Sequence, residues 1–473
     1  MITLDVVFET LTGSSPPWVD HVISDVGVDS RKMIPGALFV AVPGEEEDGH
    51  DYLEDAFENG ANFAFIQHQV PNHHRVIDLR SGQDVSSMDP VETPFCIWVE
   101  DSIQALQEVA RFWRRKLNVR TVGITGSVGK STTKELVASV LKQRYRTLKN
   151  PGNLNNEIGL PMTLWRMSHG HDRAVLEMGF YVLGEIRFLC EIAKPAVGVI
   201  TNIGTVHAER AGSIEKIAKG KAELVESLPD DPEGVAVLNY DDPLVRKMAD
   251  KTNARIFYYG LGPEADLWAD RVEGLGLEGI RFRLHYQNET LHLRVPLIGR
   301  HSVHTALRAA AVGLIEGLTW QEIINGLRIG HTQLRLMVVK SESGALLLDD
   351  TYNASPQSML AALNLLEEME GRKVAVLGDM LELGPYEEVG HTKIGIRAAE
   401  VVDSLVTVGK LARMIARAAA RSGLPEERIT VLENSEAAIL YLEDALREED
   451  VVLVKGSHGM HMNRIVSALE VSS

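Results

Sequence analysis

Cysteine is scarce in this sequence, and so are segments that would direct or anchor a chain in a membrane. Only Cys96 and Cys190 occur among 473 residues, far apart and in apolar surroundings. That argues against a disulfide framework or a zinc site and predicts two buried packing residues. No stretch approaches the roughly 20 apolar residues of a membrane span. Residues 1–12 lack the basic start and apolar run of a secretory signal, so we expect a cytoplasmic protein.

Positive charge is also in deficit. The chain has 48 Lys and Arg against 66 Asp and Glu, a formal net charge of -18. A molecule of this charge repels phosphodiester backbones, so we expect no nucleic acid partner. An anionic small substrate would have to be met by a local basic pocket.

Long internal repeats and low-complexity tracts are missing as well, and the composition is that of a globular protein, with 45% hydrophobic and 24% charged residues. The chain is too long for one ordinary core, since domains commonly hold about 100 to 200 residues. We predict an α/β fold of three domains. They are a small α/β domain (residues 1–100), a central P-loop ATPase-like parallel-sheet domain (101–330) and a Rossmann-like domain (331–473).

Short apolar runs place the expected strands. In the first domain they fall at residues 37–42 and 63–66, between Gly- and Pro-containing turns. From residue 119 onward strands alternate with helical patterns, at 174–177, 197–201 and 235–239, as in a sheet with crossover helices. Runs at 345–348, 373–377, 404–408, 429–432 and 451–454 predict the doubly wound sheet of the last domain.

The most specific motif is the glycine-rich segment VGITGSVGKST at residues 122–132, between an apolar strand and a helix expected to run to about residue 145. Its backbone N–H groups can converge on phosphate oxygens, Lys130 adds a cation, and the Ser131 hydroxyl can hold Mg²⁺. The spacing reads GxxGxxGKS, whereas the general P-loop pattern has glycine where Ile124 stands. A turn that only packs a helix onto a strand is the alternative, but this order of residues favours nucleotide binding.

Two further side chains follow strand-like runs and are candidate magnesium ligands. Glu177 ends one run, and His207 follows the run that includes Asn202. Carboxyl ends of parallel strands gather at one crevice, where a magnesium nucleotide would need such ligands. Alone, a strand-end Glu is more often solvated and a lone His more often structural.

With these features in place, the chain resembles the Mur ligase family over nearly all of its length. The resemblance is carried by the phosphate loop and by the segments at residues 29–32 (DSRK), 36–41 (GALFVA), 48–50 (DGH), 176–179 (LEMG) and 202–207. Within the family, residues 152–161 (GNLNNEIGLP), 349–356 (DDTYNASP) and 377–384 (LGDMLELG) are typical of the branch that adds a dipeptide.

The resemblance implies a reaction and its participants. ATP and Mg²⁺ would be the cofactors, and UDP-N-acetylmuramoyl-tripeptide and D-alanyl-D-alanine the substrates. ATP would phosphorylate a carboxylate to an acyl phosphate, which the incoming amine would then attack. We expect a monomer.

The resemblance also assigns residues. The expected catalytic residues are Lys130, Lys221 and His207, and the expected magnesium ligands are Ser131, Glu177, His207 and Lys221 as a carbamate. The expected nucleotide contacts are Thr125, Gly126, Ser127, Gly129, Lys130, Ser131, Thr132, Arg335, Asp350 and Tyr352. The expected substrate contacts are Ser30, Arg31, Asp48, Gly49, His50, Asn155, Asn156, Asn353 and Lys455. By sequence alone, Lys221 could equally be a solvated helix lysine like Lys216 and Lys219.

Some positions depart from the family pattern. Ser302 and Thr305 stand where asparagines are common, and His458 stands where arginine is usual. Two alternatives stay open: a Mur-type ligase that adds a different amine, and a P-loop regulatory ATPase without ligase activity. An amino-acid-adding ligase would be expected to carry an Asp-Asn-Pro-Arg type of motif, which this sequence lacks.

Overall fold

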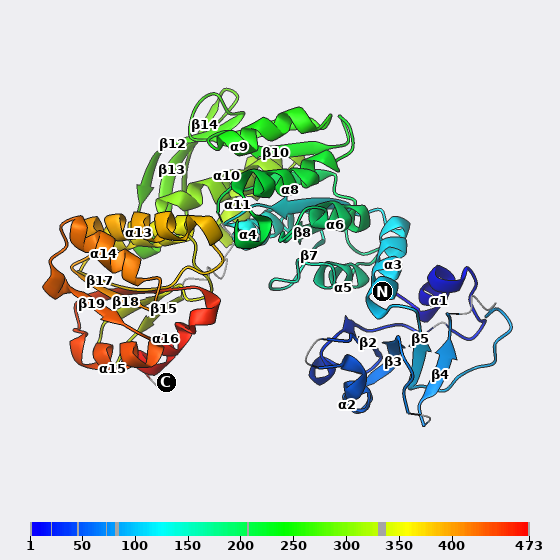
Figure 1. The fold of residues 1–473 in the computed structure, drawn as a ribbon. Coiled ribbons are helices and arrows are strands. Elements are labelled where there is room, and N and C mark those ends of the chain that lie inside the picture. The colour runs from blue at the N-terminus through cyan, green and yellow to red at the C-terminus, as the bar shows by residue number, and fades with distance from the viewer. Residues whose placement is uncertain are drawn as a thin grey trace. The chain divides into compact units, whose positions relative to one another are not determined.

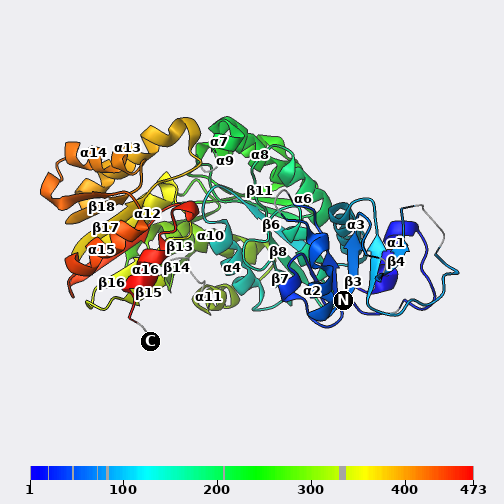
Figure 2. The ribbon, with the colours of Figure 1, turned by 60° about the horizontal axis from the view of Figure 1, so that its bottom comes forward.

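The computed structural model describes residues 2–19, 21–44, 47–71, 73–80, 85–205, 208–329 and 337–471 (Figures 1 and 2). Within these ranges no helix has the length and apolar character needed to cross a membrane. The chain divides into two compact units. The first comprises Met1–Gly123, Tyr145–Phe180 and Gly184–Val197, and the second Ile124–Arg144, Tyr181–Leu183 and Gly198–Ser473.

The first unit begins with a five-stranded sheet of order β1-β2-β3-β5-β4, in which all neighbouring strands are parallel. Its strands are β1 (Val26–Gly27), β2 (Ala37–Val40), β3 (Ala61–Ile66), β4 (Arg75–Asp78) and β5 (Phe95–Trp98). The helices are α1 (Leu4–Thr12), α2 (Leu53–Glu58) and α3 (Ser102–Lys116). The predicted strands at 37–42 and 63–66 are therefore present. Every residue of β2 is buried, which is typical of a parallel strand covered on both faces.

The remainder of the first unit holds the parallel pair β7 (Thr147–Lys149) and β8 (Arg173–Glu177), with helices α5 (Gly159–Trp165) and α6 (Glu185–Ala193). Strands β6 (Arg120–Thr125) and β9 (Val197–Ile200) continue from this unit into the second. Cys96 and Cys190 are both buried and form no disulfide, as the sequence predicts.

In the second unit the chain continues with parallel strands β10 (Val235–Asn239), β11 (Arg255–Gly260) and β12 (Leu267–Gly274), followed by antiparallel β13 (Ile280–Tyr286) and β14 (Glu289–Val295). The helices of this part are α4 (Lys130–Leu141), α7 (Ala208–Ala211), α8 (Ile214–Glu226), α9 (Pro243–Arg246), α10 (Val303–Ile315) and α11 (Trp320–Ile329). Helix α4 ends before the predicted residue 145, because Gln143 and Arg144 donate to carbonyls three residues back in a tightened last turn.

The C-terminal sheet has the order β15-β16-β20-β17-β18-β19, with β15 antiparallel and the others parallel. Its strands are β15 (Met337–Lys340), β16 (Leu346–Asp349), β17 (Arg372–Gly378), β18 (Ser404–Val408), β19 (Ile429–Leu432) and β20 (Asp450–Lys455). Helices α12 (Pro356–Glu368), α13 (Glu387–Val401) and α14 (Arg413–Arg421) contribute to one apolar core, and α15 (Ser435–Ala445) and α16 (Asn463–Leu469) to a second. Figures 1 and 2 show these two groups on opposite faces of the sheet, which confirms the predicted Rossmann-like arrangement.

Candidate active site

The phosphate loop connects the end of β6 to the start of α4. Gly126 has φ +147°, and a Cβ atom there would lie 1.8 Å from the Thr201 Oγ1 atom, so only glycine fits. Thr201 follows β9; its N–H donates to the carbonyl of Thr125 (3.0 Å) and its hydroxyl donates to the carbonyl of Val128 (2.7 Å). The end of β9 therefore fixes the path of the loop.

Asn202 holds the next part of the loop. Its Oδ1 accepts from the Val128 N–H at 3.0 Å, and its Nδ2 donates to the Val128 carbonyl at 3.0 Å. Its own carbonyl accepts from the Ser127 N–H at 2.9 Å, and the Ser127 hydroxyl accepts from the Gly204 N–H at 2.8 Å. The loop is thus held in shape by contacts within the protein. Sequence reasoning placed residues 202–207 in a family motif but missed this bracing role.

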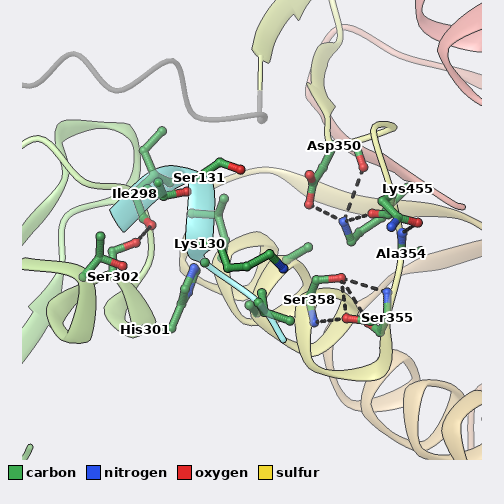
Figure 3. A pocket seen from close by; sticks show the side chains of 18 of the residues that line it. Lys130, Ser131, Ile298, His301, Ser302, Asp350, Ala354, Ser355, Ser358 and Lys455 are labelled. Atoms are coloured by element: carbon green, nitrogen blue, oxygen red, sulfur yellow. Dashed lines mark hydrogen bonds and ion pairs between the residues drawn. The ribbon is translucent and has the colours of Figure 1, made fainter. Parts of the chain in front are cut away.

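A pocket of about 240 Å³ lies beside the loop, within the second unit. Its lining residues are Ser127, Val128, Gly129, Lys130, Ser131, Thr132, Ile298, His301, Ser302, Thr305, Asp350, Asn353, Ala354, Ser355, Ser358, Ala361, Ala362, Leu365 and Lys455. Figure 3 shows Lys130 between His301 on one side and Ser355 and Ser358 on the other. Five predicted loop contacts, together with Asp350, Asn353 and Lys455, therefore share one pocket.

Lys130 is the first residue of α4, where the positive end of the helix dipole already favours anions. Its Nζ donates to the carbonyls of Gly126 (3.0 Å) and Ser127 (3.2 Å). The ammonium group thus lies against the loop in this structure, among the backbone atoms that would surround a phosphate.

The opposite wall of the pocket carries an ion pair between a buried lysine and a partly buried aspartate (Figure 3). Lys455, the last residue of β20, is 1% exposed, and its Nζ lies 2.7 Å from the Asp350 carboxylate. It also donates to the carbonyl of Asn353 at 2.8 Å. Asp350 follows β16, and since β16 and β20 are parallel neighbours, both residues emerge at the same edge of the sheet. The pair places fixed charges where the C-terminal sheet meets the pocket.

Lys221 lies on α8 and is 3% exposed. Its Nζ donates to the carbonyl of Gly126 at 3.0 Å, so the structure brings it to the phosphate loop, as the resemblance implies. Burial, and then the positive charge of Lys130, hold the pKa of the Lys221 ammonium well below its usual range. Lys216 and Lys219 on the same helix are exposed, so the reading of Lys221 as a third solvated lysine is wrong.

Glu177 ends β8 in the first unit and is 1% exposed. Asn155 donates to its carboxylate at 2.9 Å. Asn150, which is fully buried, bonds the backbone of Glu177 on both sides, accepting from its N–H (2.9 Å) and donating to its carbonyl (3.2 Å). Asn156 instead accepts from the Gly159 N–H at 2.9 Å, at the start of α5. Asn150 was not predicted, and its only signal in the sequence is its place beside the 152–161 motif.

The predicted uridine-nucleotide residues lie at the carboxyl edge of the N-terminal sheet. Asp48 accepts from the ring of His50 at 2.6 Å and from that of His68 at 2.8 Å. The two rings stack with centroids 3.6 Å apart. Ser30 is buried, and a Cβ atom on Gly49 would lie 2.6 Å from the backbone N of Val42. Sequence reasoning missed His68.

Two other predicted residues, Arg31 and Tyr352, have exposed side chains. Arg31 is highly exposed and paired with Asp29 at 2.8 Å. Tyr352 is 41% exposed, with its ring 6.2 Å from that of His458, and does not line the pocket. His207 and Arg335 lie outside the described residues.

A braced glycine-rich loop at the start of a helix, opening on a pocket that a Rossmann-like sheet completes, defines an ATP-binding α/β enzyme. Family models match nearly the whole chain. The matches are "Mur ligase family, catalytic domain" over residues 22–114, "Mur ligase middle domain" over 124–313 and "Mur ligase, glutamate ligase domain" over 334–458. The chain belongs to the Mur ligase family.

Relatives and solved structures agree with that membership. The chain is 35% identical to the UDP-N-acetylmuramoyl-tripeptide--D-alanyl-D-alanine ligase of Bacillus subtilis, over 97% of this chain and 95% of that protein. It is 34% identical to the Escherichia coli ligase of the same name, over 99% and 98%. Among solved structures, MurF from Acinetobacter baumannii matches with TM-score 0.82 and 28% identity, over 98% and 97% of the chains. MurF from Thermotoga maritima in complex with ADP matches with TM-score 0.77 and 26% identity, over 97% of each.

Proposed function

We propose that this chain is an ATP-dependent ligase that adds D-alanyl-D-alanine to UDP-N-acetylmuramoyl-tripeptide, as a monomer in the cytoplasm. One observation carries the proposal: the phosphate loop with Lys130 and the Asp350–Lys455 pair line one pocket, in a chain whose relatives bear that ligase name over nearly their full length. In this proposal residues 1–100 hold the uridine nucleotide, 101–330 hold ATP and 331–473 receive the dipeptide.

The chemistry needs a site that handles phosphate and excludes water. The substrate carboxylate attacks the terminal phosphorus of ATP, and ADP leaves. The amine of the dipeptide then attacks the acyl carbon, and phosphate leaves from the tetrahedral intermediate. Lys130 and the loop N–H groups stabilise the charge that develops on the transferring phosphoryl group. Asp350, Asn353 and Lys455 provide hydrogen-bonding and charged groups on the opposite wall, and Arg335 and Tyr352 stay predicted nucleotide contacts.

The donor set fits magnesium, which prefers hard oxygen ligands. The Ser131 hydroxyl lines the pocket, and Glu177 offers a buried carboxylate oriented by Asn155. When bound, Mg²⁺ would neutralise charge on the phosphate oxygens. His207 stays a predicted ligand.

Lys221 would serve as a carbamate. A lowered pKa leaves more of its amine neutral, and only the neutral amine can attack CO₂ to form the N–C bond with release of a proton. The product carries one negative charge shared by two oxygens, in place of a cation. Burial beside the Gly126 carbonyl supports this assignment.

The N-terminal edge would bind the uridine nucleotide. Ser30, Gly49 and His50 form its floor in this proposal, while Asp48 orients the histidines and exposed Arg31 pairs with the pyrophosphate. Asn155 and Asn156 would contact the substrate near Glu177.

The test is release of phosphate from ATP and Mg²⁺ with UDP-N-acetylmuramoyl-tripeptide and D-alanyl-D-alanine, together and with each omitted, while the product is followed by mass. We expect release that requires both substrates and yields the pentapeptide nucleotide. Release that needs the nucleotide but ignores the dipeptide would indicate a different amine. ATP hydrolysis indifferent to both would identify a regulatory ATPase and end the ligase proposal.

A further inference from the structure

Arg308 on α10 is a buried guanidinium that no part of the proposed reaction uses. It is 3% exposed. Its Nε donates to the Thr133 hydroxyl at 2.9 Å, its Nη1 to the Tyr259 hydroxyl at 3.2 Å and its Nη2 to the Thr305 hydroxyl at 2.8 Å. All three partners are neutral.

No carboxylate within the described ranges lies within ion-pair distance of Arg308. An arginine stays charged in proteins, and a buried charge is costly unless an opposite charge or a dense set of hydrogen bonds compensates it. Arg372 is an example of compensation by an opposite charge, since its guanidinium lies 2.6 Å from the fully buried carboxylate of Asp450. The positive charge of Arg308 is therefore left available to an anion.

Arg308 lies directly behind the phosphate loop. Gly129, the residue before α4, has φ +82°, and a Cβ atom there would lie 3.3 Å from the Arg308 Nη2. Thr133, in the first turn of α4, links the two by donating its hydroxyl proton to the Gly129 carbonyl at 2.6 Å. The guanidinium thus adds its charge to the helix end where phosphate would bind.

The three hydroxyls are also oriented by Arg308. Each accepts from the guanidinium and must direct its own proton elsewhere. Thr133 donates to Gly129, and Tyr259 donates to the carbonyls of Ile200 (3.1 Å) and Thr201 (3.0 Å). For Thr305 the described residues provide no acceptor, and its side chain lines the pocket. The hydroxyl proton of Thr305 is therefore the one left to donate to a ligand.

We propose that Arg308 is a positioning residue of the nucleotide site: it supplies a second buried positive charge for the phosphates, behind the loop that carries Lys130, and it makes Thr305 a hydrogen-bond donor to the nucleotide. The inference rests on the proposed ATP-dependent function. It also accounts for threonine at position 305, where the family resemblance leads one to expect asparagine.

The experiment compares the full-length wild type with Arg308→Met and Arg308→Lys by calorimetric titration with ADP and with adenosine, at fixed Mg²⁺. Losing a charge close to the phosphates should weaken ADP binding about tenfold or more in Arg308→Met. Adenosine binding should stay within about twofold, because adenosine carries no phosphate, and Arg308→Lys should recover part of the ADP affinity. In turnover, KM for ATP should rise while kcat at saturating ATP changes little.

Arg114→Met is the matched control for the loss of a buried arginine. Arg114 is 9% exposed and bonds only neutral groups, including the carbonyls of Ala193 (2.9 Å) and Val119 (2.7 Å), and it does not line the pocket. The Arg114→Met variant should have lower thermal stability and unchanged ADP affinity. A purely structural Arg308 would behave in the same way.

Thr305→Val and Thr305→Ser test the second half of the proposal and need no change at Arg308. Valine should weaken ADP binding about fivefold, the value of a single hydrogen bond, and serine should restore it. ADP affinity unchanged in both Arg308→Met and Thr305→Val would overturn the inference. Failure of the wild type itself to bind ADP or ATP would instead reject the proposed function.

Discussion

Lys221 and Lys455 are buried lysines of the same unit, but the charged groups beside them have opposite signs. Lys455 lies 2.7 Å from the carboxylate of Asp350. Lys221 donates to the Gly126 carbonyl and feels the positive charge of Lys130, which adds to burial in lowering its pKa. Burial has the largest effect on the pKa of Lys221, and the like charge of Lys130 lowers it further, whereas Lys455 has an opposite charge beside it. One position suits an electrostatic contact, and the other suits covalent modification.

The largest expected effect that follows from this contrast is on catalysis at Lys221. We expect Lys221→Met to lower the rate of ADP-forming ligation by at least about 10²-fold, the cost of losing a group that stabilises transition-state charge. Short-chain carboxylates added to the variant should restore part of the rate, because they can supply the missing oxygens. Phosphate release with both substrates measures the effect.

Lys219→Met is the control for the Lys221 experiment. Lys219 is on the same helix and exposed, so its loss should leave the rate unchanged. Wild-type activity in Lys221→Met would refute the carbamate assignment.

The second effect is on stability at Lys455. Lys455→Met would leave the partly buried carboxylate of Asp350 without its partner, and we expect it to destabilise the C-terminal sheet by about 2 kcal/mol, between the values for exposed and buried pairs. Amide hydrogen exchange in β16 and β20 should accelerate accordingly, while Lys410→Met, at an exposed lysine that follows β18 of the same sheet, should not change it. Lys221→Met should cost little stability. Equal destabilisation by Lys455→Met and Lys221→Met would contradict the proposed difference between the two lysines.

The third effect is the pH dependence of stability at Lys221. Its folded-state pKa lies below the ordinary value of 10.5, so between the two values the unfolded chain binds one proton more than the folded chain. Stability therefore rises with pH in that window, by at most about 1.4 kcal/mol per unit, and falls as pH drops towards the folded pKa. In thermal melts in bicarbonate-free buffer, the stability of the wild type relative to Lys221→Met should increase from pH 7 to 9.5. A constant difference would contradict the lowered pKa.

Much of this fold could be predicted because its signals are local. The buried parallel strands correspond to short apolar runs, and the order of glycine, lysine and serine residues indicates the phosphate loop. The antiparallel strands β13 and β14 were not predicted. Their faces alternate between buried and exposed residues, a weaker pattern than a continuous apolar run.

The candidate site could be predicted only where a residue belongs to a motif. Lys221 was separated from Lys216 and Lys219 by the family resemblance, since spacing along one helix does not show which lysine faces the core. Asn202, Arg308 and His68 act on partners brought close by strand pairing and helix packing. Arg308, for example, contacts Thr133 from 175 residues away, and nothing in the local sequence reports that distance.

The smallest expected effect concerns the stacked pair His50 and His68, two similar side chains whose pKa values shift in opposite directions. His50 donates to Asp48 and accepts from the Gln67 N–H at 3.0 Å, so its ring is neutral, and burial lowers its pKa. His68 faces acceptors on both sides, the Asp48 carboxylate at 2.8 Å and the Gln69 carbonyl at 3.3 Å, which favours the imidazolium. Although burial opposes it, the bond to Asp48 raises the pKa of His68 above 6.5.

A raised pKa means that the His68 contribution to stability is complete below 6.5 and is lost as pH rises through the folded value. Because the ring is about half exposed, we expect it to be worth only about 0.5 kcal/mol. His68→Gln should therefore be slightly less stable than wild type at pH 5.5 and indistinguishable from it at pH 8.5, whereas His292→Gln, at an exposed histidine, should match wild type at both. NMR titration of the His68 ring measures the shift directly, and a pKa at or below 6.5 would show that Asp48 does not outweigh burial there.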